Sequence, residues 1–302
     1  MIPVVVGSSP IGHPSFAPRK WRTPALGGRP SVRPAAAALL SAALAQVEIN
    51  ARGVARSADP EFLHQLRVGL RRLRTVQRAF GIPGAKRRLR KFKPALAAAR
   101  DWDVFCGWLE NTRVSPELKS LARRKRAAAR RRAQHVLSSR AFDQFLRCAR
   151  RCVHETQASP LKALEAFHRK ALKTARRIDW QHEEDRHALR IRIRRLRYAC
   201  EFFGPFFPGT RYAAYLKRVK ALQDLLGELN DIAVARRFLK EMKAAPPEQL
   251  QRHEARLISA LGPAWAAFET SRTFWDSNPI LAIRDPQAAA RARSGRRHPP
   301  DG

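Results

Sequence analysis

An internal repeat restricts the fold of this chain more than any other feature of its sequence. The segment HQLRVGLRRLR (residues 64–74) aligns with HALRIRIRRLR (residues 187–197), and the tetrapeptide RRLR stands at the same place in both. Farther along, LAAARDWDV (96–104) aligns with LGELNDIAV (226–234). The same two blocks in the same order, twice, predict two copies of one structural unit.

Nearly every segment between residues 34 and 276 has the composition and spacing of a helix. Alanine, leucine, arginine, lysine and glutamate dominate, and apolar residues recur at helical spacing. Stretches such as GIPG, FFPGT and AAPPE interrupt the pattern, because proline and glycine end helices. About eight or nine helices are expected, and no stretch alternates convincingly as a strand does. The predicted fold class is all-α, with repeat halves at about 34–138 and 160–276.

The two ends of the chain have a different composition from the middle. Residues 1–33 are rich in proline and glycine without helical periodicity, and residues 285–302 form a basic tail of similar character. Both segments are predicted to be disordered.

The charge balance points to a polyanionic partner. The chain of 302 residues has 60 lysines and arginines against 25 acidic residues, a formal net charge of +35 that ion pairs within the chain cannot neutralise. A hydrophobic content of 44% allows a true core, so the chain is not a disordered basic tail.

No apolar run approaches the roughly 20 residues of a membrane span. Four cysteines are too few for a disulfide scaffold, which indicates a reducing compartment and a cytoplasmic location. The sequence predicts no metal site and no cofactor, and it leaves the oligomeric state open.

The repeated helix carries a cationic stripe beside an apolar one. On a helical wheel the leucines 63, 66, 70 and 73 form the apolar stripe, and basic residues occupy the neighbouring arc. Because this cationic stripe borders the core, we expect it to line a groove between helices; a solvated surface is the alternative. Arginine suits such a groove, since it remains charged and makes forked hydrogen bonds to oxyanions. The residues of the two stripes are His64, Arg67, Arg71, Arg74 and Arg78 in the first copy and His187, Arg190, Arg194 and Arg197 in the second.

The helix that follows each stripe is also basic. Arg90 in the first copy, and Lys217 and Lys220 in the second, are expected to face the same groove across a helical hairpin. Asp101, Asp103 and Asp231 of the second block could serve as catalytic carboxylates, but in a chain so poor in acids they are expected to orient arginines or cap helices.

The repeated histidine–arginine helices, each followed by RDWDV or LQDLLGELND, resemble the two halves of a CHAD domain, the conserved histidine α-helical domain. The resemblance covers roughly residues 35–275. It implies two pseudo-symmetric four-helix bundles forming one domain with a central basic groove. It also implies binding of inorganic polyphosphate and association with polyphosphate granules. By this resemblance nine of the residues named above would be anion ligands: His64, Arg67, Arg71, Arg74, His187, Arg190, Arg194, Arg197 and Lys220.

Three functions remain to be weighed. Non-catalytic polyphosphate binding fits a groove of arginines without stacking aromatics. Nucleic-acid binding fits the charge, and weak non-specific binding is expected of any protein this basic. However, only Tyr198 lies near the basic arc as a stacking ring, and no recognition motif such as a zinc finger appears in the sequence. An enzyme acting on polyphosphate would need a carboxylate cluster for metal or a nucleophile beside the groove, and neither stands at adequate spacing. The sequence therefore predicts a polyphosphate-binding protein that is not an enzyme.

Overall fold

The computed structural model describes residues 17–25, 32–82, 86–151, 160–204, 207 and 210–275. Within these residues it contains nine helices and no strand, which confirms the all-α prediction. The helices are α1 (Val32–Arg56), α2 (Pro60–Ala79), α3 (Lys86–Glu110), α4 (Pro116–Leu137), α5 (Arg140–Arg151), α6 (Pro160–Ala175), α7 (Glu183–Phe203), α8 (Thr210–Glu241) and α9 (Glu248–Glu269).

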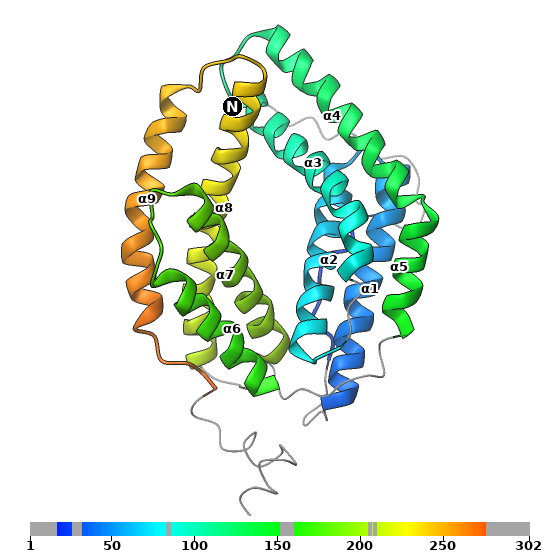
Figure 1. Cartoon of the computed structure of the whole chain (residues 1–302), viewed down its shortest axis with the longest axis vertical. Coiled ribbons are helices and arrows are strands. Elements are labelled where there is room, and N and C mark those ends of the chain that lie inside the picture. Colours follow the sequence, from blue (N-terminus) through cyan, green and yellow to red (C-terminus); the bar gives the residue numbers. More distant parts are fainter. Residues whose placement is uncertain are drawn as a thin grey trace, which may run out of the picture.

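The helices form two groups (Figure 1). One group contains α1 to α5 and the other contains α6 to α9, and the two groups meet where α2 packs on α7 and α3 packs on α8. The first group has five helices instead of the expected four, because α5 falls between the two predicted halves. Its Phe142 and Phe145 are buried against Phe92 of α3, with ring centroids 5.3 and 5.2 Å away.

The repeated helices α2 and α7 touch near their C-terminal ends. The Phe80 ring meets the Phe203 ring edge-on, with 5.4 Å between centroids, and both side chains are fully buried. These two phenylalanines occupy equivalent positions of the aligned copies. A contact between equivalent residues is what a twofold relation between the copies would produce; that relation itself remains a prediction.

Helix α2 is fixed at its start and along one face. The Asp59 side chain caps it by accepting a hydrogen bond from the Glu61 backbone N–H at 2.8 Å, and Pro60 occupies the first turn. The predicted apolar stripe is buried, in large part against α1. A Cβ atom at Gly53 of α1 would lie 1.9 Å from the Phe62 ring, so glycine is required for this close approach. The cationic stripe is therefore turned away from α1.

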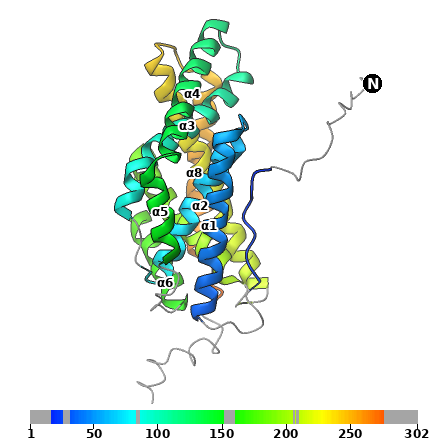
Figure 2. The ribbon, with the colours of Figure 1, turned by 90° about the vertical axis from the view of Figure 1, so that its right-hand side faces the viewer.

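Residues 17–25 run beside α1, as Figure 2 shows in dark blue. The Arg19 backbone N–H donates to Asn50 Oδ1 at 3.1 Å, and Asn50 Nδ2 donates back to the Arg19 carbonyl at 2.9 Å. The Trp21 ring packs on Phe202 of α7 with 5.5 Å between centroids. A buried asparagine and a tryptophan thus hold this stretch against the helices, while the disorder expected of residues 1–33 as a whole stays a prediction. The remainder of that segment before α1, and the tail at 285–302, lie outside the described residues.

Helix α1 is long and apolar enough, by length and composition, to cross a membrane. A buried core helix and an N-terminal signal sequence can pass the same test. Here its apolar side chains, including Leu39, Leu40 and Val47, are buried within the helical assembly.

Candidate functional site

A cavity of about 1230 Å³ lies between the two groups of helices. Side chains of α2 and α3 line one side, and side chains of α7 and α8 line the other. Fourteen arginines and lysines line it among the described residues, against the three carboxylates of Asp101, Glu183 and Asp231. This excess of positive charge makes the cavity a candidate anion-binding site.

Eight of the twelve residues predicted for the groove line this cavity. They come from both repeated helices and are His64, Arg67, Arg71, Arg74, Arg78, His187, Arg190 and Arg194. The neighbouring leucine stripe is held in the core, which fixes the rotation of each helix and turns these side chains toward the cavity. Their role as anion ligands stays a prediction.

The other four predicted residues, Arg90, Arg197, Lys217 and Lys220, do not line the cavity. Arg90, Lys217 and Lys220 are exposed on α3 and α8. The cavity touches α8 only in its C-terminal half, from Leu226 onward, whereas both lysines belong to the N-terminal half. Arg197 is turned toward Glu201 one helical turn later, with 3.1 Å between Nε and Oε1.

Several cations of the cavity were not predicted. Arg236, Arg237 and Lys240 extend the lining along the end of α8, and Lys243 follows in the loop to α9. The run ARRFLKEMK at residues 235–243 was a visible signal, but it lies outside both repeated blocks. Lys93 and Arg100 of α3, Arg186 and Arg195 of α7 complete the set.

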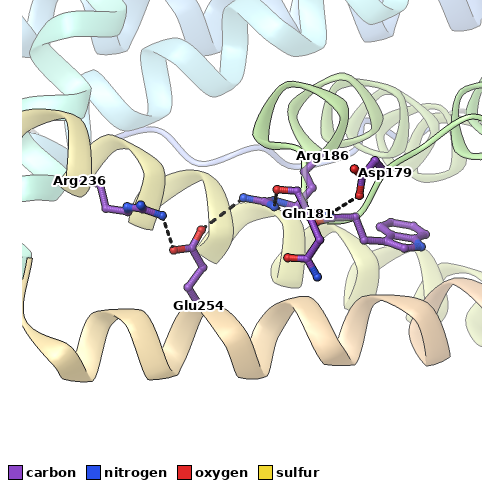
Figure 3. A network of polar contacts seen from close by, with 6 residues as sticks. Asp179, Gln181, Arg186, Arg236 and Glu254 are labelled. Carbon is purple, nitrogen blue, oxygen red and sulfur yellow. Dashed lines mark hydrogen bonds and ion pairs between the residues drawn. The ribbon is translucent and has the colours of Figure 1, made fainter.

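Two of these cations are held by one carboxylate (Figure 3). Glu254 of α9 accepts from Arg236 Nη1 at 2.8 Å and from Arg186 Nη2 at 3.3 Å. The buried Arg186 also donates to the carbonyls of Trp180 and Gln181, both at 2.8 Å. These bonds satisfy Arg186, so its role is to join α7 to α9.

Tyr198 is the one tyrosine, tryptophan or phenylalanine among the described lining residues. Arg71 Nε donates to its hydroxyl at 3.3 Å. The guanidinium of Arg72 lies between the Tyr198 and Trp21 rings, 4.5 Å from each centroid, and pairs with Glu201 at 2.6 Å. Tyr198 therefore connects the cavity to the stretch that contains Trp21.

The carboxylates next to the cavity contact arginines. Asp101 accepts from Arg237 Nη2 at 3.4 Å, and the buried Asp103, which lies outside the lining, accepts from Arg126 Nε at 2.6 Å. Orientation of arginines, as expected from the sequence, accounts for both. Burial raises the pKa of Asp231, which the nearby Arg190 opposes.

Comparison with known proteins now identifies the family. The sequence profile of the CHAD domain matches residues 38–240. The chain belongs to the CHAD domain family. Its fold is similar to the crystal structure of the CHAD domain from the plant Ricinus communis, with 28% sequence identity and a TM-score of 0.71. That match covers 86% of this chain and 99% of the plant domain. No curated protein gives a significant match.

The acidic groups around the cavity of this CHAD domain do not balance the positive charge of its arginines. Burial lowers the pKa of Arg194 to about 9 and that of Arg67 to about 10, and in both cases Arg71 is the largest unfavourable charged neighbour. Arg67 Nε is buried without a hydrogen-bond partner among the described residues. Both guanidinium groups stay charged at neutral pH, so a bound anion would remove an electrostatic penalty.

The two repeated histidines of the CHAD domain differ in surroundings. Burial, followed by the charge of Arg100, lowers the pKa of His64 to about 4, so the ring is neutral at pH 7. His187 Nδ1 lies 3.1 Å from Asn230 Oδ1. A neutral His64 could donate one hydrogen bond to an anion at the cavity wall without adding to the repulsion.

Proposed function

We propose that this CHAD domain binds inorganic polyphosphate in the cavity between α2, α3, α7 and α8. The observation that carries the proposal is the convergence of both repeated helices on one cavity with fourteen cations and three carboxylates. Guanidinium groups bind phosphate oxygens through forked hydrogen bonds, and a polymer with about one charge per phosphate supplies many such oxygens in series.

The composition of the cavity wall favours a polyanion without bases. Single-stranded nucleic acids gain much of their affinity from stacking on aromatic side chains. Here Tyr198 is the sole such ring in the described lining, and its two neighbours Arg71 and Arg72 already contact it. Polyphosphate needs no such platform.

The proposed role is that of a binder and not of an enzyme. Asp101 is bound to Arg237, and Asp231 lies beside Arg190, so both serve the charge balance of the arginines. In the cell such a protein would associate with polyphosphate granules in the cytoplasm.

A pair of double variants tests this function. Arg71→Ala with Arg194→Ala removes one cation from each repeated helix at the cavity. Lys217→Ala with Lys220→Ala removes the same charge from exposed positions outside it and serves as the control. We expect the first to weaken binding of long-chain polyphosphate by about 30-fold, at about 1 kcal/mol per charge-assisted contact, while circular dichroism shows unchanged helix content. Equal losses in the two double variants would contradict the proposal.

A further inference from the structure

A second cavity, of about 640 Å³, lies between α2, α6 and α7. Its cations are Arg78, Lys170, Arg192 and Arg195, and its described lining contains no carboxylate. Arg78, Ile191 and Arg195 line this cavity and the main one, so the two share a wall formed by α2 and α7.

Small side chains leave this space open. Ala163 and Ala166 of α6 face it, as does the exposed Ala188 of α7. Larger apolar residues at these positions would fill the hollow. The cations therefore surround an accessible space and do not pack against each other as a closed surface.

Two arginines, Arg78 and Arg195, are neighbours in the shared wall, at positions where the other half of the repeat has an ion pair. Arg72 of the first copy pairs with Glu201 of the second at 2.6 Å. In the alignment of the two copies, Arg195 corresponds to Arg72, and Arg78 corresponds to Glu201. An arginine therefore stands where the carboxylate of the ion pair would be. Burial lowers the pKa of Arg195 to about 10, and Arg78 contributes more to this than any other charged neighbour. Arg78 and Arg195 thus lack the carboxylate that neutralises Arg72 in the Arg72–Glu201 pair.

Resting on the proposed function, we infer that a long polyphosphate chain continues from the main cavity past Arg78 and Arg195 into this second cavity. Its phosphates there neutralise Arg192 and Lys170, so the second cavity binds the part of the polymer that extends beyond the main cavity. Short oligophosphates that fill only the main cavity do not reach it. The protein therefore discriminates chain length through residues that are remote from most of the main site.

The test compares chain lengths. Arg192→Ala with Lys170→Ala removes the two cations that belong to the second cavity alone. Arg169→Ala with Arg177→Ala removes equal charge from exposed positions that line neither cavity. Each purified full-length variant is titrated with tripolyphosphate and with chains of about 100 phosphates. We expect the first variant to lose about tenfold in affinity for long chains and less than about twofold for tripolyphosphate, with the control unchanged for both.

A steric variant distinguishes binding of the polymer in the second cavity from a general effect of charge. Ala188→Phe fills the second cavity without changing the charge, and we expect the same selective loss for long chains. Equal loss for both chain lengths, an equal loss in the control, or wild-type binding by both cavity variants would overturn the inference. In the last case, a loss in Arg71→Ala with Arg194→Ala would leave the proposed function standing, whereas its normal binding would refute both.

Discussion

Removal of Arg194 should stabilise the free protein and weaken the complex. Arg194 is half-buried at the cavity, and burial together with Arg71 and Arg190 lowers its pKa to about 9. Each pKa unit corresponds to about 1.4 kcal/mol, so this lowering sets an upper limit of about 5 kcal/mol for the electrostatic penalty of the charged form. Because the side chain keeps contact with solvent, screening reduces the expected gain to about 1–2 kcal/mol.

The variant Arg194→Met keeps the aliphatic stem and deletes the charge. We expect its melting temperature, measured without polyanions at pH 7, to exceed that of the wild type by about 2–4 °C. With excess polyphosphate the wild type should have the higher melting temperature, since it binds the ligand more tightly and is stabilised more by it.

The pH dependence of this difference has a definite sign. The unfolded state binds the Arg194 proton more tightly than the folded state, so the penalty is complete below about pH 9 and disappears as the pH rises toward the pKa of the unfolded chain. The difference in melting temperature between Arg194→Met and the wild type should therefore become smaller above pH 9.

A matched substitution on the same helix provides the control. Arg197 pairs with Glu201 at 3.1 Å, so Arg197→Met should lower the melting temperature or leave it unchanged. Destabilisation of the ligand-free protein by Arg194→Met, to the same extent as by Arg197→Met, would refute the claim that the cavity arginines lack counter-charge.

Three other perturbations have predictable outcomes. Glu254→Gln should lower the free energy of unfolding in urea by about 3 kcal/mol, because it leaves the buried Arg186 without its carboxylate; an unchanged midpoint would contradict this. Arg78→Glu should raise the melting temperature of the free protein by a few degrees, by giving Arg195 an ion pair, and a decrease would argue against repulsion between Arg78 and Arg195. In NMR titrations His64 should stay neutral to about pH 5, and its contribution to stability, complete above pH 6.5, should be lost as the pH falls toward 4. Titration of the free protein's His64 near 6.5 would disprove its burial among cations.

The core of the two repeated helices follows from local rules. The leucine stripe of α2 and its counterpart in α7 are buried as the helical wheel predicts, and this places the adjacent cations at the cavity. Equivalent sequence positions did not predict equivalent roles, however. Arg72 is buried with Glu201, whereas its counterpart Arg195 faces Arg78 and two cavities. The partner of each arginine comes from the other copy, so an alignment of the copies alone does not reveal it.

The second helix of each hairpin was harder to predict. Lys220 belongs to a helix that runs from Thr210 to Glu241, and only its later part reaches the cavity. A long helix crosses its neighbour over a limited length, and the crossing point depends on tertiary packing that periodicity does not encode. The wheel gives the face of a residue but not its height along the helix, which is why Lys217 and Lys220 were assigned to the cavity and Arg237 and Lys240 were not.

Competition between two polyanions tests the central claim most directly. The purified protein is titrated with long-chain polyphosphate at near-physiological salt, and single-stranded DNA is added at matched phosphate concentration. The account predicts tight binding that DNA does not displace, because the cavity offers cations but few stacking surfaces. Displacement of the polyphosphate by DNA at equal phosphate concentration would mean that the protein binds any polyanion through its positive charge alone, and it would contradict a specific polyphosphate site.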